Sequence, residues 1–521
     1  RWKSPFGNPV SAFSAANASR SAPCRSFMTF VLPLLKAGWK LRLPYNPIQD
    51  TDMPPTLQQR RRWIISLFLA VWALYGMTTN LWDQYGYNLM HAGVEAIAER
   101  RTFCLLGSDT PKFAKIGEEK PMPGRDASTD VFFYHGRLYP VKQPGMFFLG
   151  AIIYKPLSLM GLRYNREYNL AAALVSWLTS GLLGALAVAL LFAQALREGL
   201  PLRPALIAAL SLGIGTIFFA YGGVLHHDFI AGCLFFFAYY LLYGRGFQTP
   251  INAGHFLFAG LLGGFAVTTS VLAVMFVAPF AAAVIWSRGL RPFFILTLGF
   301  IIGLIPLLFY DWACFGNPFM LPNAAAKDVY TLPQIIPWKS LKEQFFWYFI
   351  SWRSLWAFSP ILIFAFWGLC ARIKEGNLNK DAWMLVSAVS NLFLTVPFIP
   401  SRGGSAFGPR YLLPAVPLLA VGVLPILQKF ESWRKELPRP LRQLVWALFG
   451  LAFSMSVAIC FSGALRGSMH GMDVHPYYYR LTVALGLSSI LETPGAFPLL
   501  YPLIFLTAAV FFFFPRQKQE S

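Results

Sequence analysis

Runs of apolar residues separated by short polar stretches dominate the chain from residue 63 onward. Because a helix needs about 20 mostly apolar residues to cross a bilayer, this pattern predicts about twelve membrane-spanning helices. The runs are residues 63–79, 168–196, 203–222, 229–243, 255–268, 270–286, 291–310, 356–371, 382–399, 411–428, 443–462 and 498–514. We therefore expect an all-α polytopic membrane protein.

Basic residues set the expected orientation, because cytoplasmic loops are rich in Lys and Arg. Arg60, Arg61 and Arg62 precede the first run, and further basic residues fill the gap 429–442. All the basic gaps fall on one side only if the apolar run 145–161 does not cross the membrane. We therefore expect 145–161 to lie in the interface or to re-enter, and both termini to be cytoplasmic.

This orientation leaves a polar outer face. Its stretches are 80–167, 311–355, 401–410 and 463–497. The first is long, and its apolar spacing from Tyr87 to Ile97 predicts a juxtamembrane helix. Most histidines and many aspartates fall on this side, so we expect any chemistry to face the outside.

Residues 1–52 differ from the rest of the chain. They hold no acidic residue before Asp50, and they are rich in Ser, Ala and basic residues, as transit peptides are. The alternative is untranslated upstream sequence, with the start at Met28 or Met53. We expect 1–52 to be an extension outside the core, and 53–521 to be the integral membrane domain.

Composition excludes several classes of protein. Hydrophobic residues make up 56% of the chain and charged residues 13%, with a mean hydropathy of +0.50. Soluble domains carry about 25% charged residues, so this chain cannot cover a soluble surface. The net charge is +21, but the Lys and Arg residues that produce it lie between the apolar runs, where loops of a membrane protein carry them, so the charge does not indicate nucleic-acid binding. Six cysteines without a CxxC exclude a disulfide scaffold or a zinc ribbon.

Ionisable residues are almost absent from the apolar runs and gather at their outer ends. A transporter or flippase needs a polar path across the membrane, and the chain shows no inverted pair of broken helices. The pattern is typical of a site at the membrane–water boundary, acting on a substrate that is partly in lipid.

The first candidate site residue is Asp83, at the outer end of the first span in Thr79-Asn80-Leu81-Trp82-Asp83. A carboxylate that is partly desolvated there can act as a general base. The alternative is that Asp83 only caps the helix that follows.

The second candidate group lies late in the first outer stretch, where Gly136 and Gly145 permit turns. Asp130, Arg137 and Lys142 can bind a sugar hydroxyl and a phosphate there. An ordinary outer hairpin with solvated charges explains the same pattern.

The third group is His226-His227-Asp228, between two spans. Adjacent histidines rarely face one ion and further ligands are missing, so we expect no metal and no other cofactor. We expect His226 and His227 to face a phosphate at the start of a helix.

The fourth group is the Gly-rich stretch 401–410 with Arg402 and Arg410. Glycines let the backbone approach a ligand, and each guanidinium matches a phosphate with two parallel donors. The alternative is that these arginines anchor lipid headgroups.

Several short motifs follow one another along these stretches. An acid follows the first span at Asp83, and a turn reads Gly136-Arg137-Leu138-Tyr139…Lys142-Gln143-Pro144. Later stretches read Cys314-Phe315-Gly316-Asn317-Pro318, Trp352-Arg353-Ser354-Leu355-Trp356-Ala357-Phe358-Ser359-Pro360 and Phe407-Gly408-Pro409-Arg410-Tyr411-Leu412. Over roughly 63–430, the chain resembles bacterial GT-C glycosyltransferases of the protein-mannosyltransferase-like (family-39-like) group. It departs from that pattern in having a single acid after the first span, and Gln143 where the group has a proline pair.

The resemblance implies a GT-C fold and an inverting transfer from a polyprenyl-phosphate sugar in the outer leaflet. It implies that a carboxylate deprotonates the acceptor hydroxyl, with Asp83 as first candidate and Asp130 as second. Tyr139 and Tyr411 join the expected binding residues because they lie in the shared motifs. The acceptor is a glycan, a lipid or a protein.

We expect this activity in a bacterial inner membrane, with membrane lipids around the protein and no nucleic-acid partner. Two other functions stay open. One is a transporter or lipid flippase, and the other is a non-catalytic partner in envelope assembly, for which the outer acids would be dispensable.

Overall fold

The computed structural model describes residues 56–79, 81–110, 130–244, 251–326, 341–374, 380–399, 406–468 and 506–507. The N-terminal extension 1–52 lies outside the described residues. So do Arg402 and all but two residues of the expected last span, 498–514.

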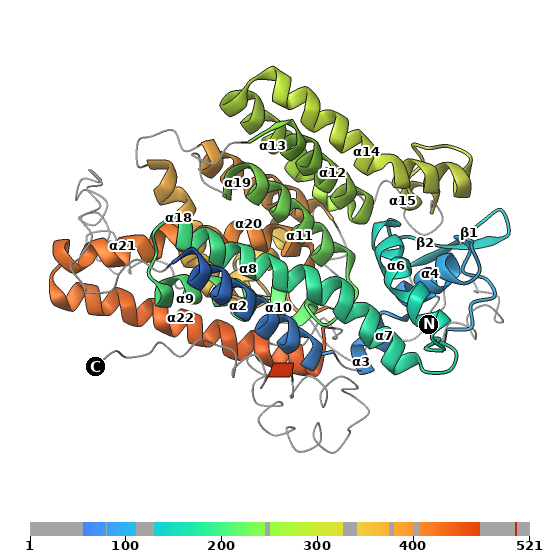
Figure 1. Cartoon of the computed structure of the whole chain (residues 1–521), viewed down its shortest axis with the longest axis horizontal. Helices are drawn as coiled ribbons and strands as arrows, with labels where there is room; N and C mark the ends of the chain where they lie inside the picture. The colour runs from blue at the N-terminus through green and yellow to red at the C-terminus, as the bar shows by residue number, and fades with distance from the viewer. Residues whose placement is uncertain are drawn as a thin grey trace, which may run out of the picture. The chain divides into compact units, whose positions relative to one another are not determined.

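The described part is almost entirely helical (Figure 1). The α-helices are α2 (Leu57–Met77), α3 (Leu81–Gly86), α4 (Asn88–Ala98), α6 (Gly145–Leu159), α7 (Tyr168–Ser176), α8 (Leu182–Arg197), α9 (Leu202–Gly213), α10 (Phe218–Tyr221), α11 (His227–Tyr239), α12 (Ala253–Thr269), α13 (Val274–Arg288), α14 (Leu290–Phe315), α15 (Pro322–Ala325), α16 (Leu341–Phe349), α17 (Leu355–Phe358), α18 (Ile361–Lys374), α19 (Lys380–Thr395), α20 (Val416–Ala420), α21 (Val423–Glu436) and α22 (Arg439–Arg466). Shorter helical turns are η1 (Trp177–Gly181), η2 (Tyr240–Gly244), η3 (Val271–Ala273), η5 (Val396–Phe398) and η6 (Arg410–Ala415).

Several of these helices identify an integral membrane protein. In the described ranges, five are long and apolar enough to cross a membrane: Tyr168–Arg197, His227–Gly244, Val271–Arg288, Leu290–Phe315 and Arg439–Leu465. A sixth results if Arg410–Ala420 and Val423–Phe430, which meet at a bend of 41°, form one span. The count of twelve stays a prediction, because several of the expected runs form shorter or broken helices.

The breaks have local causes in the sequence. The run 411–428 bends around Gly422, and Pro360 separates α17 from α18 because proline cannot continue a helix without losing a hydrogen bond. The run 168–196 stays one 30-residue helix, in which a π-turn at η1 takes up the irregularity.

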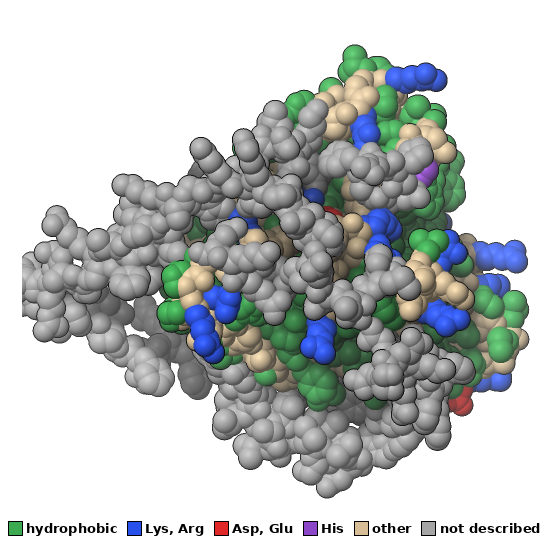
Figure 2. Space-filling model, turned by 60° about the vertical axis from the view of Figure 1, so that its left-hand side comes forward, with side chains coloured by type: hydrophobic (Ala, Val, Ile, Leu, Met, Phe, Trp, Pro, Cys, Tyr) green, Lys and Arg blue, Asp and Glu red, His purple; other side chains and the backbone are tan. Residues whose placement is uncertain are grey.

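Burial separates the helices that face neighbours from those that face lipid. Every residue of α11 is buried, as expected for a helix that is apolar on all sides. Helices α14 and α22 expose large apolar side chains along their length, including Leu298, Ile305 and Leu448. Among the described side chains on the face shown in Figure 2, most are hydrophobic, with scattered Lys and Arg side chains between them.

A small subassembly of α4, α6 and a β-hairpin lies beside the bundle (Figure 1). The hairpin pairs β1 (Val131–Tyr134) with β2 (Arg137–Pro140) in antiparallel register. His135 and Gly136 both have positive φ, at 48° and 74°, as a tight two-residue hairpin turn requires. The turn expected at Gly136 is therefore present. The apolar run 145–161 forms α6, which packs along α4.

One end of the bundle is held by polar contacts between basic helix ends. The Arg372 guanidinium lies 3.2 Å from the Glu198 carboxylate, and Arg197 donates to the Gly244 carbonyl at 3.0 Å. Gln428 donates to the Glu198 carbonyl at 3.2 Å. His227 and Asp228 lie at the opposite end of the helix that Gly244 ends.

Candidate functional site

Charged residues from separate stretches converge where several helices begin or end. Asp83 follows α2, His226 precedes α11, Arg410 begins η6, and Lys142 precedes α6. The charge of Arg410 acts on Asp130, Lys142, His226, His227 and Asp228. The structure thus brings together residues from all four of the candidate groups that the sequence marks.

Asp83 is buried, with an exposed fraction of 1%. It lies in the first turn of α3, where the sequence allows a capping role. Its two carboxylate oxygens lie 2.6 Å and 2.8 Å from the backbone N–H of Ser468, which donates to them. The carboxylate is therefore held by a distant segment of the chain and is more than a local helix cap.

Lys142 and Asp130 form an ion pair, with 2.8 Å between Nζ and Oδ1. Burial alone would raise the pKa of the Asp130 carboxyl, but the Lys142 ammonium and then Arg410 hold this pKa below its ordinary value. Burial would lower the pKa of Lys142, and Asp130 outweighs it, so this pKa is raised. Both groups are therefore charged at neutral pH.

The position of Lys142 depends on a close approach between α6 and α12. A Cβ on Gly145 would lie 2.7 Å from the Cα of Thr269, so only glycine lets the two helix ends meet. The contact brings the 142–145 turn beside Ser270, whose hydroxyl donates to the Asp228 carboxylate at 2.6 Å.

Arg410 is half-buried at the start of η6, and its guanidinium lies 5.4 Å from the ring centre of Tyr411. Its Nε has no hydrogen-bond partner among the described residues. A buried guanidinium donor without a partner suits an anionic ligand, because leaving it unpaired costs free energy. Arg410 and Lys142 are close enough for their charges to act on each other. Two cations at this spacing can bind the same anion.

His226, His227 and Asp228 are all buried. The rings of the two histidines stack with centres 4.7 Å apart, and His227 Nε2 lies 3.4 Å from Asp228 Oδ2. Burial, and then the charges of Arg410 and Lys142, keep the pKa of His226 well below its ordinary value, so its imidazole is neutral. Neither ring nitrogen of His226 has a hydrogen-bond partner within the described ranges.

The expectation of no metal at the adjacent histidines stays a prediction. One ligand atom from each of His226, His227 and Asp228 lies within 4.8 Å of the others, a spacing that can hold a metal ion. The neutral His226 imidazole has one N–H, which can donate to a phosphate held by the two cations.

Three residues of the site were not on the expected list. The Tyr87 ring meets His226 edge-on at 5.5 Å between ring centres, and the Tyr221 ring lies 4.8 Å from the same histidine. The Tyr221 hydroxyl donates to the Phe407 carbonyl at 3.0 Å. A tyrosine at the outer end of an apolar run is a usable signal for Tyr87 and Tyr221, since its hydroxyl needs a polar partner there. No local pattern marks Ser468.

The remaining expected residues lie elsewhere. Tyr139 is buried in an aromatic cluster with Phe132 and Phe315, which ties the hairpin to the end of α14. Arg137 is exposed beside the hairpin turn. The ligand-binding roles of Tyr139 and Arg137 stay predictions. The packing of Tyr139 in this cluster accounts for its position structurally.

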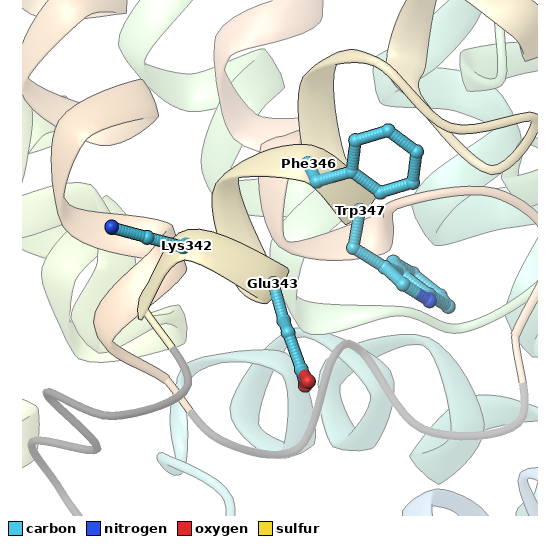
Figure 3. Close-up of a pocket in the computed structure, with 4 residues that line it drawn as sticks. All are labelled: Lys342, Glu343, Phe346 and Trp347. Atoms are coloured by element: carbon cyan, nitrogen blue, oxygen red, sulfur yellow. The ribbon is translucent and has the colours of Figure 1, made fainter. Parts of the chain in front are cut away.

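A surface hollow of about 370 Å³ lies on α16, lined by Lys342, Glu343, Phe346 and Trp347 (Figure 3). The four side chains come from the first two turns of one helix and fan out from it. None of them belongs to the group around Asp83 and Arg410, so this hollow is not the candidate site.

Comparison with known proteins gives similarities of structure alone. No family model and no curated protein sequence matches the chain. ArnT from Cupriavidus metallidurans, solved bound to undecaprenyl phosphate, is 14% identical, with a TM-score of 0.46 over 88% of this chain and 76% of that chain. The archaeal oligosaccharyltransferase AglB from Archaeoglobus fulgidus, solved with an inhibitory peptide and a dolichol-phosphate, is 15% identical, with a TM-score of 0.43 over 81% of this chain and 57% of that chain.

Proposed function

We propose that this protein is a GT-C-type glycosyltransferase, which moves a sugar from a polyprenyl-phosphate donor to an acceptor hydroxyl with inversion. The observation that carries the proposal is the convergence of a buried carboxylate, Asp83, with two cations, Arg410 and Lys142, at the helix ends. A base and a phosphate-binding pair are the two parts that such a transfer needs. The matched structures hold a lipid phosphate of the same class.

The reaction follows from the chemistry of these groups. The ionised Asp83 takes the proton of the acceptor hydroxyl while that oxygen attacks the anomeric carbon from the face opposite the phosphate. The bond between the anomeric carbon and the phosphate oxygen breaks, and its electron pair leaves with the lipid phosphate. Arg410 and Lys142 stabilise the negative charge on the departing phosphate.

Asp130 serves this mechanism through Lys142. The ion pair fixes the ammonium and keeps it protonated, since the pKa of Lys142 is raised mainly by Asp130 against the effect of burial. A carboxylate already paired with a lysine is a weaker base than one held by a neutral amide. This favours Asp83 as the base and Asp130 as a positioning residue.

The orientation of the site follows from the charges at the two ends of the bundle. Arg60 to Arg62, Arg197, Arg288 and Arg372 lie at helix ends away from Asp83. Positive residues favour the cytoplasmic side, so we place the site outside, in a bacterial inner membrane, with both termini in the cytoplasm. The donor and the acceptor then meet in the outer leaflet.

Transfer without a metal ion is the form of the reaction that we propose. Arg410 and Lys142 already supply two positive charges to a phosphate, and both act on His226, His227 and Asp228. A divalent cation at these three residues would add to that positive charge, with which it would compete for the phosphate.

The direct experiment is to incubate the purified protein with radiolabelled polyprenyl-phosphate sugars and a membrane extract that supplies acceptors. We expect label to move to an acceptor, and Asp83→Asn to slow the transfer by about 10²-fold or more. Flux of labelled lipid across liposomes without an acceptor would instead favour the flippase. Absence of both activities would favour the assembly partner.

A further inference from the structure

The turn that follows α22, Gly467-Ser468, touches both halves of the site. The Ser468 N–H donates to both oxygens of Asp83, although the two residues are 385 positions apart. The Ser468 carbonyl accepts a hydrogen bond from the Phe407 N–H at 2.8 Å. One residue therefore bridges the candidate base and the segment that leads into Arg410.

Further contacts make this bridge part of a network. The Ser468 hydroxyl donates to the Tyr87 hydroxyl at 3.3 Å, and Tyr87 lies one turn after Asp83. The Phe407 carbonyl accepts from Tyr221, so both backbone groups of Phe407 are held. The Phe407 ring also packs against Gly463 near the end of α22. The 407–410 segment and the end of α22 thus form one packed unit.

The backbone at Gly467 lets the Ser468 amide point at Asp83. Gly467 has φ of 96°, in the region that side chains with a Cβ rarely adopt, and it ends the 28-residue helix α22. A residue with a Cβ would strain this conformation and turn the next amide away from the carboxylate. The position of one N–H at the site therefore depends on a glycine.

We propose that Gly467 and Ser468 are positioning residues of the transferase, an inference that rests on the proposed function. The Ser468 N–H fixes the orientation of the Asp83 carboxylate, while its carbonyl holds the 407–410 segment. The distance from the base to the phosphate-binding arginine is thereby set by one residue.

The sharpest test is Ser468→Pro, which removes the N–H and keeps the carbonyl. We expect turnover at saturating donor to fall about 10²-fold, because a misplacement of about 1 Å costs that much, while the Kd for polyprenyl phosphate changes less than about twofold. Ser468→Ala keeps the amide and loses only the bond to Tyr87, so its loss should stay within about fivefold.

Gly467→Ala is the second variant, because it retains every hydrogen-bonding atom and changes only the backbone angle. We expect a turnover about tenfold lower, from the strain at positive φ. Gly450→Ala on the same helix is the matched control, since nothing lies within 4 Å of a Cβ there. It should leave turnover unchanged.

A double-mutant comparison separates positioning from a general structural defect. If Ser468 and Gly467 act through the carboxylate, Ser468→Pro and Gly467→Ala should each add less than about twofold to the loss of Asp83→Asn. The inference would be overturned if the loss in each double mutant equalled the product of the two single-mutant losses. Normal turnover of both Ser468→Pro and Gly467→Ala would also overturn it. Normal turnover of both Asp83→Asn and Asp130→Asn would overturn the proposed function instead.

Discussion

The Lys142 ammonium lies 2.8 Å from the Asp130 carboxylate, and Arg410 acts on both residues. Lys142 is therefore held by a carboxylate partner, whereas the Nε of the Arg410 guanidinium has no hydrogen-bond partner in the part of the chain that the structure describes. This division of roles between the two cations leads to distinct expectations for their variants.

Arg410→Lys should weaken binding of the donor by about tenfold, although the charge is kept, because a lysine offers a point charge where the arginine offers a planar fork. Arg410→Ala should weaken it by about 10² or more. Binding of polyprenyl phosphate to purified protein checks both. Arg203→Lys, at an exposed position at the other end of the bundle, is the control. Wild-type affinity in both Arg410 variants would remove Arg410 from the phosphate site.

Asp83→Asn should cut turnover by about 10² or more while donor still binds, because the amide keeps the shape and cannot take a proton. Asp130→Asn should raise the donor concentration needed for half-maximal rate more than it lowers turnover, since it frees Lys142 from its partner. Single-turnover assays with saturating donor compare the two. A dead Asp130→Asn enzyme beside a normal Asp83→Asn enzyme would exchange the roles.

Donor affinity should be flat between about pH 6 and 9. The lowered pKa of Asp130 means that its ion pair is lost only as pH falls below the ordinary carboxyl range near 3.8. The pKa of Lys142 is raised above its ordinary value of 10.5, so the ammonium stays charged throughout this pH range. His226, which faces Arg410, Lys142 and Tyr87, stays neutral because its pKa is lowered.

The measurement is the Kd of a polyprenyl-phosphate sugar, whose phosphodiester does not titrate in this range. A step in affinity near pH 6.5 that disappears in His226→Gln would show that His226 takes up a proton. That result would contradict the neutral imidazole.

Treatment with EDTA followed by dialysis should leave transfer within about twofold of the untreated enzyme, because Arg410 and Lys142 supply the positive charge at the phosphate. The assay is label transfer with and without added Zn²⁺ or Mg²⁺. The opposite outcome would be a loss of activity that added metal restores in the wild-type enzyme but not in Asp228→Asn. That result would place an ion at His226, His227 and Asp228.

Cysteine labelling checks the orientation. Asp109→Cys, exposed in the first outer stretch, should react with a membrane-impermeant maleimide on intact cells. Arg439→Cys, exposed at the start of α22, should react only after permeabilisation. A Cys104→Ser background removes a half-buried native thiol. Labelling of Arg439→Cys from outside would reverse the topology.

Sequence pattern was sufficient for the class of protein and for the charged residues of the site. Long apolar runs and a low charge content require a membrane environment whatever the tertiary arrangement. Asp83, Lys142 and Arg410 could be selected because an ionisable group beside an apolar run is costly to desolvate and so indicates a functional site. The hairpin turn at Gly136 was also local, since two adjacent residues with positive φ define it.

Tertiary structure alone decided how these residues are combined. The Asp130–Lys142 pair depends on the register of the hairpin and on the contact of Gly145 with α12. Tyr221 and Ser468 join the site because α10 and α22 pack against each other, which no spacing along the chain encodes. Local propensity specifies which segments are helical and apolar, whereas the amide that reaches Asp83 from 385 residues away is placed by the packing of the whole bundle.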